Sequence, residues 1–416
     1  MAEPLGILPL RSFRDTVDKE QFTAARRDPR ARVVSKQSFD EMKSHLLELY
    51  GDLDAEHSFE DPAGAEVDCV PIESQPSLRG TDGTIAVAPD LGPVLRGEPP
   101  QVPAQQAPRA PVNFHRRDRH GNEVYVPSGT IPIRRVRLAD MARFATLSDF
   151  MRKGAGPSPV PPSAPDPDTG KNHRYAYTHQ TVDNIGGHSS LAVYAPTISS
   201  DQVFSLAQHW YSGGTGNAHQ TLEVGWQVYP AKYGHANPVL FLYWTADNYQ
   251  STGAYNLDSA GFVQTNSAWT IGGALSPVST KGGQQFEMEH AAYLFGGNWW
   301  VYAGGTSSSD ALGYYPTSLY SGGQMASKAT EITYGGETVT SAVGWPAMGS
   351  GEFASAGWQQ AAYQRNLYYY PTGGGAQWAG LTAEQPSPAC YTLQLGAAAA
   401  PWGVYFFYGG SGGGNC

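Results

Sequence analysis

The segment TLEVGWQVYP (residues 221–230) decides the fold class of this chain. Apolar and polar residues alternate along it with a period of two, which is the pattern of a β-strand with one buried face. The apolar face holds Leu222, Val224, Trp226 and Val228, and the opposite face holds Glu223, Gly225 and Gln227. The segment therefore predicts a strand whose second face carries a carboxylate next to a residue without a side chain.

Similar short segments recur from residue 173 to the end of the chain, for example PVLFLYWTAD (238–247), NWWVYAGG (298–305) and GVYFFYGG (403–410). Turn residues separate them at the spacing that is typical of antiparallel sandwiches and barrels. Strands that alternate with long amphipathic helices are missing, which argues against an α/β fold. The predicted fold is mainly β, with an antiparallel β-sandwich preceded by a smaller α+β domain.

The first part of the chain has a different texture. SFDEMKSHLLELY (38–50) predicts a helix, because Ser38 and Glu41 have the spacing of a capping box and apolar residues follow at helical intervals. The stretch 154–172 is rich in Pro, Ser and Gly and has no apolar face, so it predicts a linker that proteases can reach. The predicted division is an N-terminal domain at 1–153, a linker at 154–172 and a β domain at 173–416.

Charge is scarce in the predicted β domain. Residues 173–416 carry 12 acidic and 5 basic side chains, against 37 and 27 in the whole chain. A sparsely charged, acidic surface argues against a nucleic-acid partner. Few titratable groups also limit the build-up of charge in acid, which favours acid tolerance. No apolar run is long enough to cross a bilayer, so no membrane association is expected. The first residues lack the basic and apolar regions of a signal peptide.

The three cysteines are Cys69, Cys390 and Cys416, and none has the spacing of a zinc site. A disulfide between Cys390 and Cys416 would tie down the Gly-rich C-terminal tail and would indicate an oxidising compartment. Two unpaired thiols are the alternative.

The candidates for chemistry in the β domain are mainly carboxylates, because the sequence predicts no strand-to-helix nucleophile elbow of the GxSxG type and contains no HExxH motif. Glu223 is one candidate. Glu337, in ITYGGETV (332–339), is the other, because it also lies beside glycine in a strand pattern. Glycines at such places often mark a close approach to the backbone, so these predict cleared space beside each carboxylate. The alternative is that both glutamates are solvent-facing strand residues.

Two carboxylates that face one another have a clear chemical use. When they are close, they titrate as a coupled pair, and one member can activate a water molecule while the other, protonated, polarises a carbonyl group. That arrangement suits peptide hydrolysis without a metal or a covalent intermediate. A wider spacing suits glycoside hydrolysis. A sugar-binding sandwich without catalysis, its Trp and Tyr rings stacking on sugars, is a third possibility.

Many blocks of the chain, in the same order, resemble the neprosin family of glutamic peptidases, which cleave at proline. In the β domain they include EVGWQVYPAKYG (223–234), GNWWVYAG (297–304), YGGETV (334–339) and MGSGEFASAGWQQAAYQRNL (348–367). In the N-terminal domain, VDCVPIESQPSL (67–78) and GTIPIRR (129–135) resemble the activation peptide of the family. Plant relatives carry two cysteines where this chain has Ala254 and Ser259, so their local disulfide is missing here.

The resemblance implies a secreted, acid-active endopeptidase that is made as a zymogen and cleaves on the carboxyl side of proline. It implies Glu223 and Glu337 as the catalytic pair and the N-terminal domain as an intramolecular inhibitor. Gln227 and Gln284 are candidate contacts for the substrate or for an oxyanion. The expected partners are proline-containing peptides, with neither a cofactor nor a metal, and the expected state is a monomer.

Overall fold

The structure is a computed structural model that describes residues 6–91, 117–153, 173–200, 202–340, 344–399 and 401–414. The predicted linker at 154–172 lies outside the described residues. The part of the chain up to Lys153 is called the N-terminal region below. Its helices and strands are α1 (Leu10–Lys19), α2 (Phe22–Ala25), α3 (Lys36–Tyr50), β1 (His57–Glu60), β2 (Glu66–Pro71), β3 (Thr130–Arg134), α4 (Leu138–Met141) and α5 (Leu147–Met151).

Helix α3 begins earlier than the sequence pattern predicts. Its N-cap is Ser35, whose hydroxyl accepts a hydrogen bond of 3.0 Å from the backbone N–H of Ser38. Ser38 is therefore the residue whose N–H is capped, and the predicted capping box at Ser38 and Glu41 is wrong. The buried face of α3 is apolar, as the helical spacing predicts.

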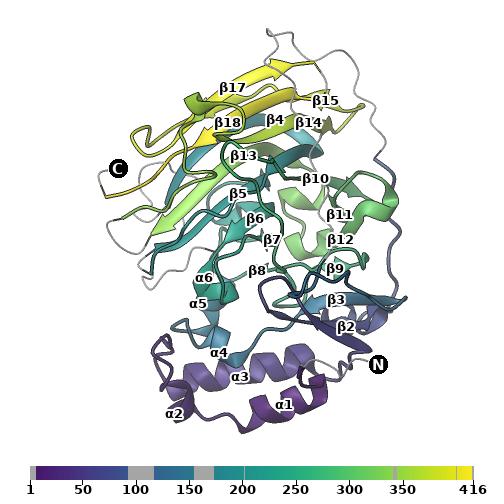
Figure 1. Cartoon of the computed structure of the whole chain (residues 1–416). Helices are drawn as coiled ribbons and strands as arrows, with labels where there is room; N and C mark the ends of the chain where they lie inside the picture. Colours follow the sequence, from purple (N-terminus) through teal and green to yellow (C-terminus); the bar gives the residue numbers. More distant parts are fainter. Residues whose placement is uncertain are drawn as a thin grey trace.

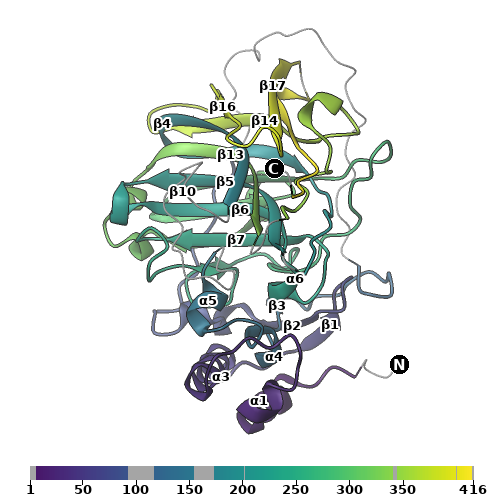
Figure 2. The same cartoon turned by 90° about the vertical axis from the view of Figure 1, so that its left-hand side faces the viewer.

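The remaining strands form one large antiparallel sheet that folds over into two layers (Figures 1 and 2). Its strands are β4 (His173–Ala192), β5 (Gln202–Gly213), β6 (Gln220–Val228), β7 (Val239–Thr245), β8 (Ala254–Tyr255), β9 (Val263–Gln264), β10 (Glu287–Phe295), β11 (Asn298–Ala303), β12 (Ala311–Pro316), β13 (Ala329–Thr340), β14 (Ala362–Pro371), β15 (Gln377–Trp378), β16 (Thr382–Glu384), β17 (Thr392–Ala398) and β18 (Gly403–Gly409), and the short helix α6 (Pro230–Tyr233) lies between β6 and β7. The principal strand order is β8-β7-β6-β5-β13-β4-β10-β11-β12-β9.

Strand β4 belongs to both layers because it is long enough to pass from one to the other. Its first half pairs with β13 and β16, and its second half pairs with β10 and β14. The apolar face of β6, with Val224 and Trp226, packs in one buried cluster with Met288 and Trp299 of β10 and β11. The predicted mainly β, antiparallel sandwich is confirmed.

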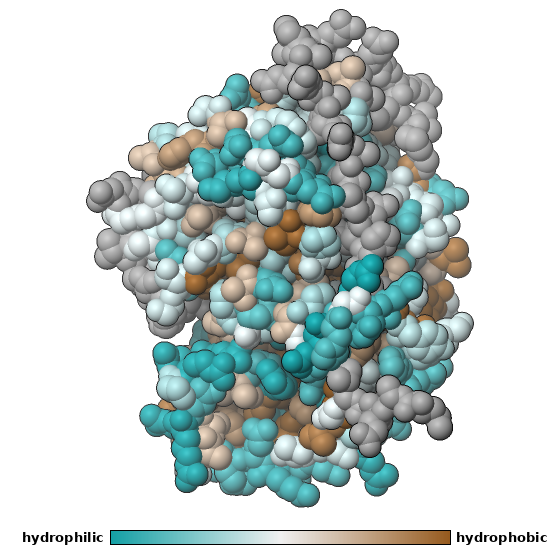
Figure 3. All heavy atoms as spheres, viewed as in Figure 1, coloured by the Kyte–Doolittle hydropathy of each residue, from teal (hydrophilic) through white to brown (hydrophobic). Residues whose placement is uncertain are grey.

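The other face of the β7-β6-β5-β13 layer is covered by the N-terminal region. Phe204 and Phe241 of this layer share a second buried cluster with Met141 and Phe150 of the N-terminal region. The two parts are thus packed together by apolar side chains. On the face shown in Figure 3, hydrophilic side chains predominate over the N-terminal helices, and apolar ones appear between them. No helix within the described ranges is long and apolar enough to span a membrane.

Candidate active site

Glu223 and Glu337 lie on the same face of the first layer, beneath the N-terminal region. Glu223 is on β6 and Glu337 is on β13, and β5 runs between these strands. On β5, Trp210 pairs with Glu223 and Leu206 pairs with Glu337. Gln208 lies midway between these two positions of β5 and on the same face of the sheet as both glutamates. Both glutamates are buried, with exposed fractions of 0% and 2%. They are therefore not the solvent-facing carboxylates of the alternative interpretation.

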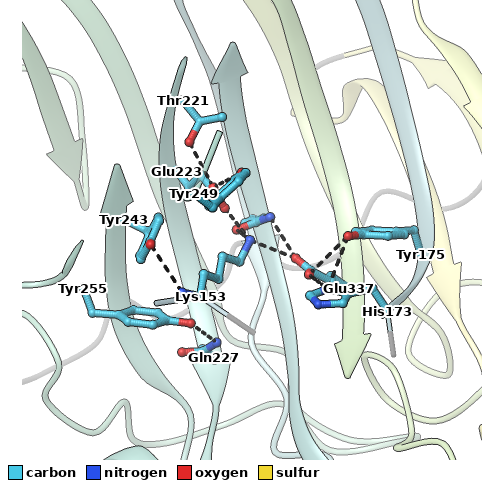
Figure 4. Close-up of polar contacts among 11 residues, drawn as sticks. Lys153, His173, Tyr175, Thr221, Glu223, Gln227, Tyr243, Tyr249, Tyr255 and Glu337 are labelled. Carbon is cyan, nitrogen blue, oxygen red and sulfur yellow. Dashed lines mark hydrogen bonds and ion pairs between the residues drawn. The ribbon is translucent and has the colours of Figure 1, made fainter. Parts of the chain in front are cut away.

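Lys153, at the end of the N-terminal region, bridges the two carboxylates (Figure 4). Its ammonium group contacts Oε2 of Glu223 and lies 2.8 Å from Oε2 of Glu337. It also donates to Oε1 of Gln208 at 3.1 Å, and the backbone N–H of Lys153 donates to the hydroxyl of Tyr243 at 3.3 Å. Since one nitrogen reaches both Oε2 atoms, the two carboxylates converge on a point that a single small group can occupy.

The Oε1 atoms of the two glutamates are held from behind by other side chains. Oε1 of Glu223 accepts hydrogen bonds from the hydroxyl groups of Tyr249 at 2.7 Å and Thr221 at 3.1 Å. Oε1 of Glu337 lies 2.7 Å from Nδ1 of His173 and accepts from the hydroxyl group of Tyr175 at 3.4 Å. Each carboxylate is thus fixed by one oxygen and presents the other to Lys153.

The bridge keeps a buried carboxylate ionised. Burial raises the pKa of Glu337, but the charge of Lys153 and the hydrogen bond and charge of His173 outweigh it and lower this pKa to about 2. For Lys153, burial lowers the pKa, and the two glutamates more than compensate, so that it lies above its ordinary value. Both charged forms therefore depend on contact with each other.

The structural reason for the glycines beside the glutamates differs from the predicted one. A Cβ atom on Gly225 would come within 2.0 Å of the carbonyl oxygen of Ala207 on β5, and one on Gly335 within 2.5 Å of that of Ala176 on β4. These positions need glycine because the neighbouring strand backbone is too close for any side chain. The prediction that they clear space for a substrate is wrong as an explanation of the glycines.

The other predicted contacts are placed differently. Gln227 lies on the same strand face as Glu223 and bonds with Tyr255 at 3.3 Å and Tyr233 at 3.4 Å. Gln284 lies on the turn before β10, which pairs with the far end of β4, so the structure does not bring it to the glutamates. Cys390 is buried, and Arg174 donates to its sulfur; its predicted partner Cys416 lies outside the described residues, so the disulfide stays a prediction.

The sequence analysis missed the residues that hold the glutamates: Lys153, His173, Tyr175, Gln208, Thr221 and Tyr249. The sequence contained a signal for Thr221, which lies two residues before Glu223 and therefore on the same face of β6. Gln208 is on β5, and only the pairing of β5 with β6 and β13 places it beside the glutamates. Nothing local marks Lys153, which follows a short helix, or Tyr249, which lies in a turn with φ of +60°. The part of the chain that the structure describes contains no cluster of three or more metal-ligating residues.

The Neprosin family model matches residues 201–411, which include both glutamates. The chain belongs to the neprosin family. Membership of this family supports the assignment of the chain as a glutamic-type peptidase, which is a hydrolase. Two solved structures of scytalido-glutamic peptidase with transition-state analogues are distantly similar. One has a TM-score of 0.30 at 8% identity and the other 0.29 at 10%, and each match covers 57% of this chain and 97% of the other.

Proposed function

We propose that this member of the neprosin family is the zymogen of a secreted, acid-active endopeptidase that uses Glu223 and Glu337 to hydrolyse peptide bonds on the carboxyl side of proline. The observation that carries the proposal is the Lys153 bridge. The ammonium group occupies the one point that both Oε2 atoms reach, which is where an attacking water molecule would have to lie. The N-terminal region therefore acts as an intramolecular inhibitor.

Hydrolysis needs Lys153 to leave the pair. Water then takes its place, one ionised glutamate removes a proton from the water, and the other glutamate, protonated, hydrogen-bonds the carbonyl oxygen of the substrate. The water oxygen bonds to the carbonyl carbon, the C–N bond breaks, and the nitrogen receives a proton. The two glutamates carry every proton that moves in these steps.

Acid favours the departure of Lys153. The pKa of Glu337 lies at about 2 in the closed state, below its ordinary value of 4.5. A lowered carboxyl pKa stabilises the closed state above pH 4.5, and that stabilisation is lost as the pH falls from 4.5 through about 2. Opening is thus coupled to the uptake of one proton, which the two carboxylates share, in this range. Cleavage within 154–172, by a second activated molecule, would then separate the inhibitor from the β domain.

Opening would also uncover an aromatic surface next to the pair. Tyr243, Tyr255 and Phe241 lie on β7 and β8 under the N-terminal region, and their rings contact one another. Flat apolar rings suit the proline ring of a substrate. The preference for proline itself is proposed from the family.

The test uses the full chain after incubation in acid, assayed on a proline-containing peptide and on the same peptide with alanine in place of proline. We expect Glu223→Gln and Glu337→Gln each to lower kcat by about a hundredfold or more, because each removes a proton-transfer group. Glu331→Gln is the matched control: Glu331 is on the same strand as Glu337 but is half-exposed beside His179.

Full activity in either glutamate variant would refute the pair. Hydrolysis of an oligosaccharide instead of the peptides would favour the glycosidase interpretation. The mass of the chain is followed during the incubation, and a full-length chain that is active at neutral pH, where the bridge is closed, would refute the zymogen.

A further inference from the structure

The two glutamates are held by chemically different partners. On Glu223, Oε1 accepts from two neutral hydroxyl groups, those of Tyr249 and Thr221. On Glu337, Oε1 faces Nδ1 of His173, a side chain that is able to carry a positive charge. In a coupled carboxylate pair, such a difference decides which member keeps the charge.

The charged and titratable groups around Glu337 come from three elements. Lys153 approaches from the end of α5 and contacts Oε2. His173 and Tyr175 approach from β4 and face Oε1. Gln208 of β5, which is uncharged, donates to Oε2 at 3.4 Å. Lys153 and His173 are thus the two side chains in this set that can bring a positive charge to Glu337.

These two side chains lie on opposite sides of the segment 154–172. Lys153 precedes it and belongs to the N-terminal region, whereas His173 follows it and is the first residue of β4. His173 is paired in the sheet with Val339, two residues from Glu337. A cut within the segment therefore separates Lys153 from the β domain and leaves His173 in its place beside Glu337.

We infer that His173 is the positioning residue that keeps Glu337 ionised after Lys153 has left, and so makes Glu337 the general base and Glu223 the general acid. This inference rests on the proposed function. The His173 imidazolium donates its Nδ1–H to Oε1 of Glu337, and Oε2 is then free to accept the proton of the water. Glu223 has no cationic partner left, so it is the member that carries the shared proton.

The assignment fixes the path of each proton. Glu337 takes one proton from the water as the water oxygen attacks the carbonyl carbon. Glu223 gives its proton to the carbonyl oxygen as the C=O bond becomes a single bond. When the carbonyl re-forms, that proton returns to Glu223, Glu337 delivers its proton to the nitrogen, and the C–N bond breaks. The products are a carboxylic acid and an amine, and both glutamates return to their starting states.

The experiment compares the pH profiles of kcat for the acid-activated wild type, His173→Gln and the control His179→Gln. His179 lies on the same strand but faces Glu331 and Glu384. For His173→Gln we expect the acidic limb of the profile to shift to higher pH by about one unit or more. The reason is that a cation at hydrogen-bond distance lowers the pKa of a carboxyl group by about one unit or more, and the variant lacks this cation. At a pH below the limb, kcat should then be about tenfold lower than in the wild type, while above the limb kcat changes little. His179→Gln keeps the wild-type profile.

An acidic limb that stays in place in His173→Gln overturns the inference. If Glu223→Gln and Glu337→Gln abolish activity in the same assay, the proposed function survives that outcome; if they do not, the proposed function itself fails. If His173→Gln does not fold, the same pH profile is measured for His173→Lys, which keeps a positive charge at this position. A permanent cation at this position must keep the limb at or below its wild-type pH, and an upward shift overturns the inference.

Discussion

Gln208 and His209 are neighbours on β5, yet they belong to two buried polar clusters on opposite faces of the same sheet. Gln208 faces the glutamate cluster, which consists of Lys153, His173, Glu223, Tyr249 and Glu337. In this cluster the positive charge of Lys153, from the N-terminal region, neutralises carboxylates of the sheet. His209 faces the histidine cluster in the sandwich core, which consists of Ser189, His209, Tyr211 and His290. The first cluster contains carboxylates whose charges Lys153 neutralises, and the second contains histidines that burial keeps neutral.

The histidine cluster is only partly hydrogen-bonded. His209 bonds through one nitrogen to Ser189 and through the other to the hydroxyl of Tyr211 at 3.0 Å. The ring of His290 lies 3.9 Å from that of His209 between centroids, and neither nitrogen of His290 has a hydrogen-bond partner among the described residues. Burial lowers the pKa of His209 well below its usual range and that of His290 to about 3, and neighbouring histidines add to the effect.

The two clusters lose their stabilising effect in different pH ranges. The histidine cluster loses stability first, because an unfolded His290 takes up a proton below its ordinary pKa of 6.5 while the folded one does not until about pH 3. The glutamate cluster holds its bridge until the pH falls below 4.5. Loss in the first cluster would unfold the sandwich, whereas loss in the second would release only the N-terminal region. The proposed acid activation therefore requires a core that is still folded although it is already weakened.

Replacing Lys153 by methionine should have the largest effect, because it removes the charge that closes the glutamate cluster. Methionine keeps most of the volume of the side chain but cannot hold two carboxylates together. We expect full-length Lys153→Met to hydrolyse a proline-containing peptide at about pH 6, at least about tenfold faster than the full-length wild type. Mass spectrometry of the same sample establishes that the chain is uncut.

The matched control is Lys43→Met, which removes a lysine of the N-terminal region that contacts Asp18 and the backbone of the same region. It should remain as latent as the wild type. Latency that persists unchanged in Lys153→Met would show that the bridge does not close the site, and the glutamate cluster would then be as purely structural as the histidine cluster.

Replacing His290 by leucine should change the acid stability of the sandwich. Neither ring nitrogen makes a hydrogen bond of regular geometry, and the backbone of Met288 makes only an irregular contact with the ring, so the substitution breaks little hydrogen bonding. The wild type should lose on the order of a few kcal/mol of unfolding free energy between pH 6.5 and about pH 3 through this residue. Leucine removes that loss, and the remaining slope comes from groups such as His209. Urea unfolding at about pH 7 and about pH 4 measures the change, and identical slopes in the two proteins would refute the explanation.

The sequence predicted the sandwich and the position of the glutamates better than it predicted their surroundings. Period-two alternation is a local property, so Glu223 and Glu337 could be assigned to a strand face before the strands were placed. The partners of the pair come from several other elements, and such contacts depend on register and on packing between distant segments. Lys153 is the clearest case, because its role exists only once the N-terminal region covers the sheet. The reason for glycine at position 225 could not be predicted either, because it is the short distance to the backbone of β5.

The smallest expected effect concerns Tyr249, which tests whether the glutamate cluster uses its neutral partners as well as its charged ones. Tyr249 reaches Oε1 of Glu223 from a turn in which Asp247 accepts backbone N–H bonds from Gln250, Ser251 and Thr252. Tyr249→Phe keeps this turn but removes one hydrogen bond, worth about 1 kcal/mol, so kcat of the activated enzyme should fall about fivefold with little change in KM. The hydroxyl of Thr221 still holds Oε1 and limits the loss. An unchanged kcat would mean that Glu223 is fixed by its strand alone, without help from the hydroxyl group of Tyr249.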